Sequence, residues 1–180
     1  MSADWFIADP HFGHKNILKY ENRPFVDIEH MDNIIIENYN RTISEGDTVY
    51  WLGDMFFCKS DRMEYIAKRL SKGRNILIRG NHDKGVTDGK FLKLGFKPYR
   101  MMSYYNAILT HEPISEVNMS YLETEGIRFN IHGHVHSRID ALDQSKYQCV
   151  SVENTDYSPI SIDEIINRFR VNRKKLSRKE

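Results

Sequence analysis

Short apolar segments recur along this chain, and nearly every one is followed within a few residues by Asp, Asn or His. A continuous apolar run of about four or five residues is typical of a strand that is buried on both faces of a sheet. The carboxyl ends of parallel strands meet at one edge of a sheet, so we expect the residues after these runs to gather there. The segments are Asp9-Pro10-His11, Gly53-Asp54, Gly80-Asn81-His82-Asp83, Thr110-His111-Glu112, Gly133-His134 and Val135-His136.

Helical patterns separate the first three of these runs. Apolar residues recur at helical spacing between residues 28 and 43, and again between residues 63 and 70. Strands that alternate with helices predict parallel pairing through right-handed crossovers. After Gly95 the helical patterns become sparse. A second, partly antiparallel sheet accounts for the strand-like residues 96–101, 104–109, 127–131 and 147–152.

The chain is predicted to form one domain, over residues 1–172, in which two packed sheets are flanked by helices. It has 180 residues, of which 40% are hydrophobic, and this is enough to build a core. A last helix is expected to begin after Ser161, where Glu164 completes a capping box. Residues 173–180 form a basic C-terminal tail, which we interpret as a solvated helix end; the alternative is a nucleic-acid arm.

Charge and cysteine content argue against several classes of protein. Lys and Arg number 26 against 25 Asp and Glu, so net charge does not draw the chain to nucleic acid or to a membrane. No apolar run approaches the roughly 18 residues that span a bilayer, and the N-terminus lacks a signal-like core, so we expect a cytoplasmic protein. Cys58 and Cys149 lie far apart in sequence, which argues against a disulfide framework and favours buried thiols.

The polar segments also follow one another in a characteristic order. The pieces D-x-H, G-D, G-N-H-D, a single His and G-H-x-H, from Asp9 to His136, resemble the calcineurin-like metallophosphoesterase superfamily, in its small single-domain bacterial and phage form. Each piece is common by chance, whereas the ordered set is rare. The resemblance implies a four-layer α-β-β-α sandwich of two mixed sheets that holds a dinuclear metal site.

The resemblance implies a role for each polar residue. Oxygen and nitrogen ligands of these types suit manganese, iron, zinc, nickel or cobalt, of which we favour manganese. Two such ions lower the pKa of a shared water and supply a hydroxide for in-line attack at phosphorus. His82 is implied to stabilise the transition state or to protonate the leaving oxygen, and Asp83 to fix its tautomer. The implied ligands are Asp9, His11 and His136 for the first metal, Asn81, His111 and His134 for the second, and Asp54 for both.

The sequence departs from the broad family pattern in two places. Phe57 stands where many members carry an acidic residue three positions after the bridging one, which leaves the implied ligand set intact. The first motif extends through His14 and Asn16 toward Arg23, and a helix N-terminus with a nearby Arg suits an anion. We therefore expect His14 and Arg23 to contact the substrate phosphate. The alternative is that Asn16 caps a helix and Arg23 forms a surface ion pair.

The predicted function is that of a metal-dependent phosphohydrolase, and more specifically a phosphodiesterase. A chain of this length has little room for a cap domain, and an open cleft favours a diester, a nucleotide or an oligonucleotide end. The alternatives are a phosphomonoesterase for a nucleotide or phosphoprotein, an inactive metal-binding scaffold, and a nucleic-acid-binding protein. No obligate protein partner is evident. The aromatic residues Phe12, Phe56, Phe57, Tyr104 and Tyr105 either stack on a base or belong to the core, and we favour the core.

Overall fold

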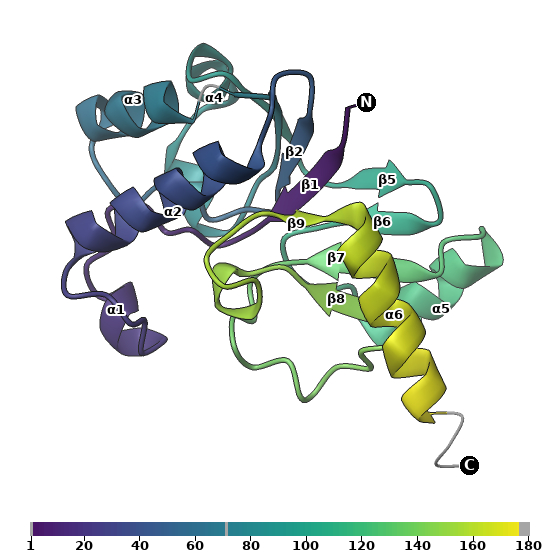
Figure 1. Ribbon diagram of the computed structural model, residues 1–180. Coiled ribbons are helices and arrows are strands. Elements are labelled where there is room, and N and C mark those ends of the chain that lie inside the picture. Colours follow the sequence, from purple (N-terminus) through teal and green to yellow (C-terminus); the bar gives the residue numbers. More distant parts are fainter. Residues whose placement is uncertain (1, 71, 177–180) are drawn as a thin grey trace.

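The chain folds into two mixed β-sheets flanked by helices, as the computed structural model shows (Figure 1). The structure describes residues 2–70 and 72–176. The first sheet has the strand order β4-β3-β2-β1-β9, and the second has the order β5-β6-β7-β8. The predicted sandwich of two mixed sheets is confirmed.

The first sheet consists of parallel strands with one short antiparallel strand at its edge. The antiparallel strand, β9, is Ile160–Ser161 and pairs with β1. Helices α1 (Ile17–Tyr20), α2 (Ile28–Thr42), α3 (Ser60–Arg69) and α4 (Asp88–Lys93) lie in the crossovers, with the 3-10 turn η1 (His82–Gly85) before α4. The parallel strands are β1 (Asp4–Ile7), β2 (Thr48–Trp51), β3 (Arg74–Ile78) and β4 (Phe96–Tyr99).

The second sheet has three parallel strands and one antiparallel edge strand, β5. Helix α5 (Glu116–Thr124) connects β6 to β7, and the 3-10 turn η2 (Val152–Asn154) follows β8. Helix α6 (Ile162–Leu176) follows β9 and ends the described part of the chain. The strands are β5 (Met102–Tyr104), β6 (Ala107–Leu109), β7 (Phe129–His132) and β8 (Tyr147–Cys149).

Two strand predictions were wrong in part. Residues 96–99 belong to the first sheet, because α4, which the sequence pattern did not indicate, returns the chain so that Phe96 pairs with Asn75 in parallel. Residues 104–109 do not form one strand. Tyr105 has a φ of 50°, so the chain turns there, and Ala107 pairs back with Tyr104 in a hairpin.

Alternate residues of the first sheet face two different hydrophobic cores. Trp51 is fully buried with Ile35 of α2 in the core between the sheet and its helices. Phe6 and Leu52 are fully buried in the core between the sheets, together with Leu109 of β6. Because both faces of β1, β2 and β3 are covered, these strands read as continuous apolar runs rather than as alternating ones.

Helix α6 packs along the space between the two sheets. It contacts β1, β8 and β9, and its Ile165 and Phe169 are buried in the inter-sheet core. The Glu164 amide donates to the Ser161 hydroxyl at 3.2 Å, which confirms the predicted N-cap. The apolar face of the helix therefore explains why the chain remains helical well beyond β9.

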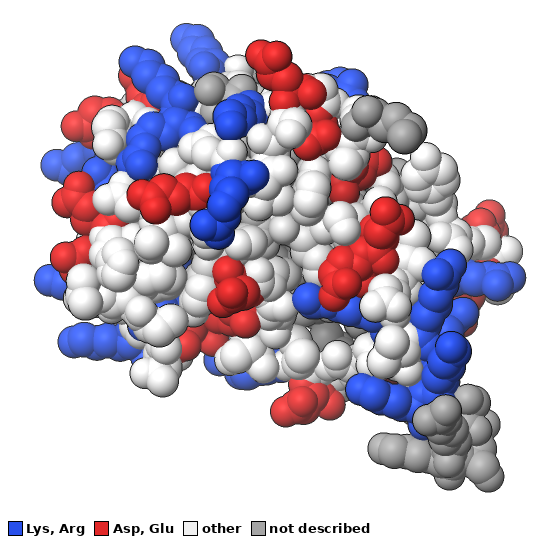
Figure 2. Space-filling view, in the orientation of Figure 1, with Lys and Arg blue, Asp and Glu red and all other residues white. Residues whose placement is uncertain are grey.

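The first residues of the predicted basic tail belong to helix α6. Residues 173–176 continue α6, and the Arg173 guanidinium lies 4.8 Å from the centre of the Phe129 ring. Figure 2 shows Lys and Arg side chains gathered toward this end of α6, while acidic and basic side chains alternate over the rest of the same face. Residues 177–180 of the predicted tail lie outside the described residues. None of the helices in the described ranges is long and apolar enough to cross a membrane.

Candidate functional site

Main-chain hydrogen bonds join the polar segments at the strand ends to one another. The Asp9 amide donates to the Gly53 carbonyl at 3.1 Å, and the Gly133 amide donates to the His111 carbonyl at 2.9 Å. The loops that follow β1 and β2 are therefore held together, as are those that follow β6 and β7. The carboxyl ends of the strands form one rim, where the sequence pattern placed them.

Strained main-chain conformations concentrate on this rim. A positive φ is uncommon outside glycine, and Asn, Asp and His adopt it more readily than other residues. Such strain persists only where surrounding contacts hold it, and it clusters at functional sites. Five predicted ligands have this conformation: Asp9 (φ 55°), His11 (52°), Asp54 (54°), His134 (70°) and His136 (51°).

Three of the predicted ligands form a first donor cluster, a group of oxygen and nitrogen atoms that can bind one metal ion. One ligand atom each from Asp9, His11 and His136 lies within 4.8 Å of the others, and all three residues are buried. Among the described residues, Asp9 Oδ1 and both ring nitrogens of His11 are buried without a hydrogen-bond partner. Burial of a polar atom without a partner costs free energy, so these unpaired ligand atoms fit a bound cation.

A second donor cluster lies beside the first. The Asn81 Oδ1 atom is 2.9 Å from His111 Nε2 and 3.0 Å from His134 Nδ1, and the two ring nitrogens are 3.3 Å apart. The His111 Nδ1–H donates to the Leu52 carbonyl at 2.8 Å, so Nε2 is the ring nitrogen that faces Asn81 and His134 and that can bind a cation once it has lost its proton. One amide oxygen and two imidazole nitrogens therefore point at one place.

Asp54 lies between the two clusters. Its Oδ2 atom is 3.7 Å from His11 Nε2 of the first cluster and 3.4 Å from His111 Nε2 of the second. Its Oδ1 atom accepts a hydrogen bond from the His82 amide at 2.9 Å. This position suits a carboxylate that is shared by two cations.

Burial and neighbouring charges shift the pKa values of these groups strongly. Burial raises the pKa of Asp9 to about 6 and lowers the pKa of His11 to about 2. Burial also lowers the pKa of His111, but pairing with Asp54 and the charge of Asp9 outweigh it and raise that pKa to about 9. In the absence of metal, His11 is therefore neutral, and His111 carries the proton that balances the carboxylates.

Glycines allow the ligand segments to approach one another this closely. A Cβ atom on Gly53 would lie 2.3 Å from His111 Nδ1, and one on Gly133 would lie 2.4 Å from Asp9 Oδ2. Gly53 also has a φ of 96°, which favours glycine. The glycines that precede the predicted ligands are therefore required by packing against ligands from other loops.

The substitution Gly80→Ala is expected to destabilise the metal-free protein. Its Cβ would lie 2.1 Å from Asp54 Oδ1, and overpacking of this kind costs about 1–3 kcal/mol in the free energy of unfolding. Denaturant unfolding measures the change. The matched control is Gly89→Ala at an exposed position of α4, where the added Cβ atom has no neighbour within 4 Å among the described residues, and equal stability of the two variants would contradict the packing role.

Sequence reasoning missed several groups that hold the ligands. Asp9 Oδ2 accepts hydrogen bonds from the Ser151 hydroxyl at 2.6 Å and from the His134 amide at 2.9 Å. The Glu153 carboxylate lies 3.0 Å from His136 Nδ1 and accepts its proton in a hydrogen bond. Glu153 follows the strand-like residues 147–152, so a polar residue after a predicted strand was present in the sequence here too.

Asp83 does not bind the His82 ring, contrary to the sequence-based expectation. Its carboxylate is buried and accepts three main-chain hydrogen bonds, from Asp54 and Gly80 at Oδ2 and from Met55 at Oδ1. These hydrogen bonds join the loop after β2 to the loop after β3. Asp83 therefore positions the main chain of Asp54, and the His82 side chain stands apart from it.

Arg23 is also placed differently from the expectation that it contacts substrate. Its side chain is fully buried and donates to Glu153 and to the Pro10 and Asp9 carbonyls. A guanidinium enclosed in this way cannot reach a phosphate that enters from solvent. The alternative, a surface ion pair, is equally wrong, because the pair with Glu153 is buried.

His14 and His82 lie on an open cleft of about 490 Å³ above the two clusters. Tyr20, His14 and His82 line the cleft, and the Phe57 ring lies between His14 and His82 in a row of rings. Along this row, from Tyr20 through His14 and Phe57 to His82, neighbouring ring centres are 6.1, 4.1 and 4.7 Å apart. Phe57, where many family members carry an acid, stacks face to face on His14. The side chain of His82 is 48% exposed, and its Nε2 atom is 4.0 Å from Asp54 Oδ2.

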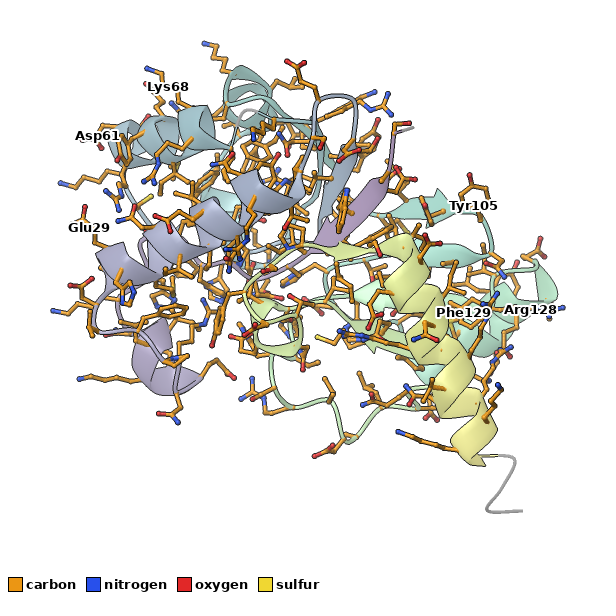
Figure 3. All side chains as sticks on the ribbon, in the orientation of Figure 1. Glu29, Asp61, Lys68, Tyr105, Arg128 and Phe129 are labelled. Carbon is orange, nitrogen blue, oxygen red and sulfur yellow. The ribbon has the colours of Figure 1, made fainter. Side chains whose placement is uncertain are left out.

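The other aromatic residues considered from the sequence do not line this cleft. Phe12, Phe56 and Tyr104 are buried in the cores, as we favoured. Tyr105 is 87% exposed at the β5–β6 turn (Figure 3). This turn precedes the amino end of β6, whereas the candidate site lies beyond the carboxyl ends of the strands.

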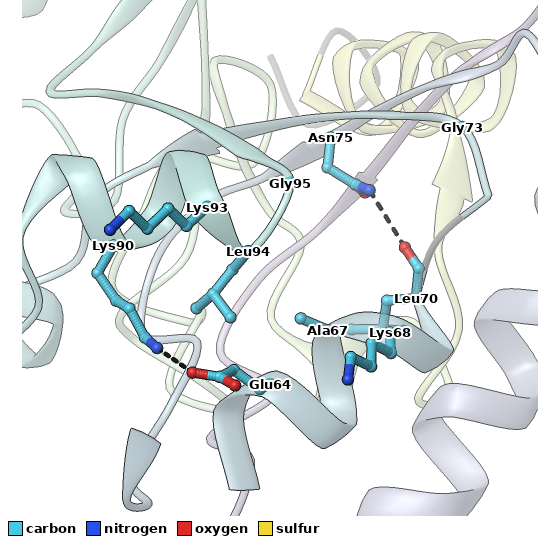
Figure 4. A pocket seen from close by; sticks show the side chains of 10 residues that line it. All are labelled: Glu64, Ala67, Lys68, Leu70, Gly73, Asn75, Lys90, Lys93, Leu94 and Gly95. Carbon is cyan, nitrogen blue, oxygen red and sulfur yellow. Dashed lines mark hydrogen bonds and ion pairs between the residues drawn. The ribbon is translucent and has the colours of Figure 1, made fainter. Parts of the chain in front are cut away.

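A second hollow lies away from the donor clusters, between α3 and α4 (Figure 4). It has a volume of about 540 Å³, and the Lys90 ammonium pairs with the Glu64 carboxylate across it. Inside it, the Asn75 amide donates to the Leu70 carbonyl at 3.2 Å. Among the described residues that line it, none belongs to the predicted site.

A sandwich of two mixed sheets that gathers these ligand atoms on one rim is consistent with the metallo-dependent phosphatase fold. The family model described as calcineurin-like phosphoesterase matches residues 5–168, and the chain belongs to this family. The family supports metal-dependent hydrolysis of a phosphoester, and the donor clusters fit the divalent ions that it typically binds.

Relatives of the chain include archaeal, bacterial and phage proteins. An uncharacterized protein of Methanocaldococcus jannaschii is 35% identical over 174 residues, which cover 92% of this chain and 90% of that protein. A protein of unknown function from Aquifex aeolicus has a solved structure that is similar with a TM-score of 0.68 and 30% identity, over 93% of this chain and 99% of that chain. The Gene 66 protein of Mycobacterium phage L5 is 33% identical over 85 residues, 46% of this chain and 41% of that protein.

Proposed function

We propose that the chain is a phosphodiesterase that uses two divalent metal ions, of which manganese is the favoured one. The convergence of two donor clusters on the Asp54 carboxylate supports this proposal most directly. Asp9, His11 and His136 hold one ion, Asn81, His111 and His134 hold the other, and Asp54 binds both. Two ions in such an arrangement polarise phosphoryl oxygens and lower the pKa of water.

The residues around the clusters supply the remaining chemistry. His82 is exposed beside Asp54, so its imidazole is placed to donate a proton to the leaving oxygen of the ester. His14 stands further along the same row of rings, where a ring nitrogen can donate to a phosphate oxygen. The Asp83 carboxylate accepts hydrogen bonds from the main-chain amides of Asp54 and Met55 and so holds the Asp54 segment in place while the ester reacts.

The shape of the cleft supports a diester rather than a monoester. Tyr20 is 69% exposed at the end of the row of rings opposite His82, and Arg138 lines the cleft near it. The cleft extends from the clusters to these residues and has a volume of about 490 Å³, which is room for a second ester group beside the leaving group. An exposed ring at that end suits a nucleobase, so we propose a nucleotide or oligonucleotide substrate.

The proposal is tested by hydrolysis of bis-p-nitrophenyl phosphate beside p-nitrophenyl phosphate. The protein is first freed of metal with a chelator and then supplied with manganese. We expect diester turnover that is lost on chelation and restored by manganese. Preferential monoester turnover would support a phosphomonoesterase instead, and no turnover of either ester with two ions bound would support a scaffold.

A further inference from the structure

A buried ion pair joins the two ends of the domain directly behind the first donor cluster. Glu153 Oε1 is 2.6 Å from Arg23 Nη2 and 2.9 Å from Arg23 Nε, and the two residues are 130 positions apart in sequence. The side chains are 0% and 7% exposed. Buried ion pairs contribute little to stability relative to apolar packing, so the geometric role of the pair is the more informative one.

Each partner of the pair also contacts a different part of the first cluster. The Arg23 guanidinium donates to the Asp9 carbonyl at 2.8 Å and to the Pro10 carbonyl at 2.9 Å. Glu153 Oε1 accepts a hydrogen bond from His136 Nδ1 at 3.0 Å. The pair therefore fixes the main chain that bears one implied ligand and the ring of another.

The contact with Glu153 also selects the tautomer of His136. A carboxylate only accepts hydrogen bonds here, so the ring proton is held on Nδ1, and Nε2 keeps its lone pair for a cation. Carboxylates behind metal-binding histidines act in this way, because they orient the ring and make it a better ligand. Glu153 is thus in a position to change the metal affinity of the first cluster.

A cation site on Glu153 itself is the competing interpretation. Glu21, His136 and Glu153 also offer ligand atoms within 4.8 Å of one another. Glu153 Oε2 is buried without a hydrogen-bond partner in the described part of the chain, so it can serve as a ligand atom. However, Oε1 of the same carboxylate already accepts two hydrogen bonds from the Arg23 guanidinium, and His136 Nδ1 already donates to that oxygen. A further cation beside this guanidinium would be repelled, so the geometry favours an orienting role.

We propose that Glu153 and Arg23 are positioning residues that set the metal affinity of the first cluster through His136. This inference rests on the proposed dinuclear centre. It assigns Arg23 a role behind the metal ligands in place of the substrate contact expected from the sequence. The pair acts on one of the two ions, because its contacts with the rim of the site lead to Asp9, Pro10 and His136, while its remaining side-chain contact is with Met31 in the core.

The test is a manganese titration of the metal-free protein, with free Mn²⁺ counted by electron paramagnetic resonance. Glu153→Gln is expected to weaken one of the two sites about 10- to 100-fold and to leave the other unchanged. The matched control is Asp47→Asn. This buried carboxylate accepts three hydrogen bonds, from Ala3, Trp5 and Ser44, at the opposite end of β1 and β2. It is expected to lower thermal stability with both affinities unchanged.

The outcomes separate this inference from the proposed function. If the unmodified protein binds fewer than two Mn²⁺ ions, the dinuclear centre is wrong. If it binds two and Glu153→Gln retains both affinities, or if Asp47→Asn weakens the same site equally, the positioning role is wrong. Should Glu153→Gln fail to fold, the double variant Arg23→Met, Glu153→Gln removes both buried charges and undergoes the same titration.

Discussion

Asp54→Asn is expected to lower turnover of the diester about 1,000-fold. The loss follows because the carboxylate faces both donor clusters, and a charge shared by two cations stabilises the site by several kcal/mol, with 1.36 kcal/mol for each tenfold change in rate. An asparagine cannot replace it. If the amide oxygen keeps the hydrogen bond from the His82 amide, the NH₂ group points toward the cations.

The measurement is turnover of bis-p-nitrophenyl phosphate together with the number of Mn²⁺ ions bound. Asp47→Asn is again the matched control, because it neutralises a buried carboxylate far from the cleft and should retain activity. Asp54→Asn with undiminished turnover would contradict the bridging role. Loss of turnover in both variants would indicate a general effect of burying an amide in place of a carboxylate.

His82→Ala is expected to lower turnover about 100- to 10,000-fold and to leave both metal ions bound. General acid catalysis by a positioned histidine has this magnitude. The His82 contact with Asp54 that fixes the loop comes from the main-chain amide, which alanine keeps. The side chain is 48% exposed, so its removal leaves no buried cavity.

Turnover and metal content of this variant are to be measured side by side. The control is His30→Ala, which removes an exposed imidazole on α2, remote from the cleft residues. His30→Ala should match the unmodified protein in both measurements. If His82→Ala lost its metal ions along with its activity, the role of His82 would be structural, and our assignment of it to proton transfer would be wrong.

The sequence predicted the strands and the residues at their ends well, because both depend on local physics. Apolar runs such as residues 48–52 identify strands that are covered on both faces, and a polar residue directly after the run lies at the edge of the sheet. Asp54 was located in this way. The helix pattern of residues 28–43 was equally local, and α2 follows it closely.

Contacts between distant segments were harder to predict. The roles of Asp83 and Arg23 were assigned from their neighbours in sequence, whereas their actual partners lie in other loops. Glu153 was overlooked although it follows a predicted strand, because its partner His136 is not identifiable from spacing. Likewise, residues 96–99 could not be assigned to a sheet without knowledge of α4.

The order of apolar runs and polar residues by itself determined that the chain forms a two-sheet sandwich with donors at one rim. Periodicity and residue chemistry are properties of short segments, so they are visible without the fold. Only the tertiary structure decided which donors meet, that Asp54 lies between the two clusters, and that a buried Arg23–Glu153 pair holds His136. Those facts depend on residues with a left-handed backbone conformation and on long-range hydrogen bonds. Both form only when the loops pack against one another.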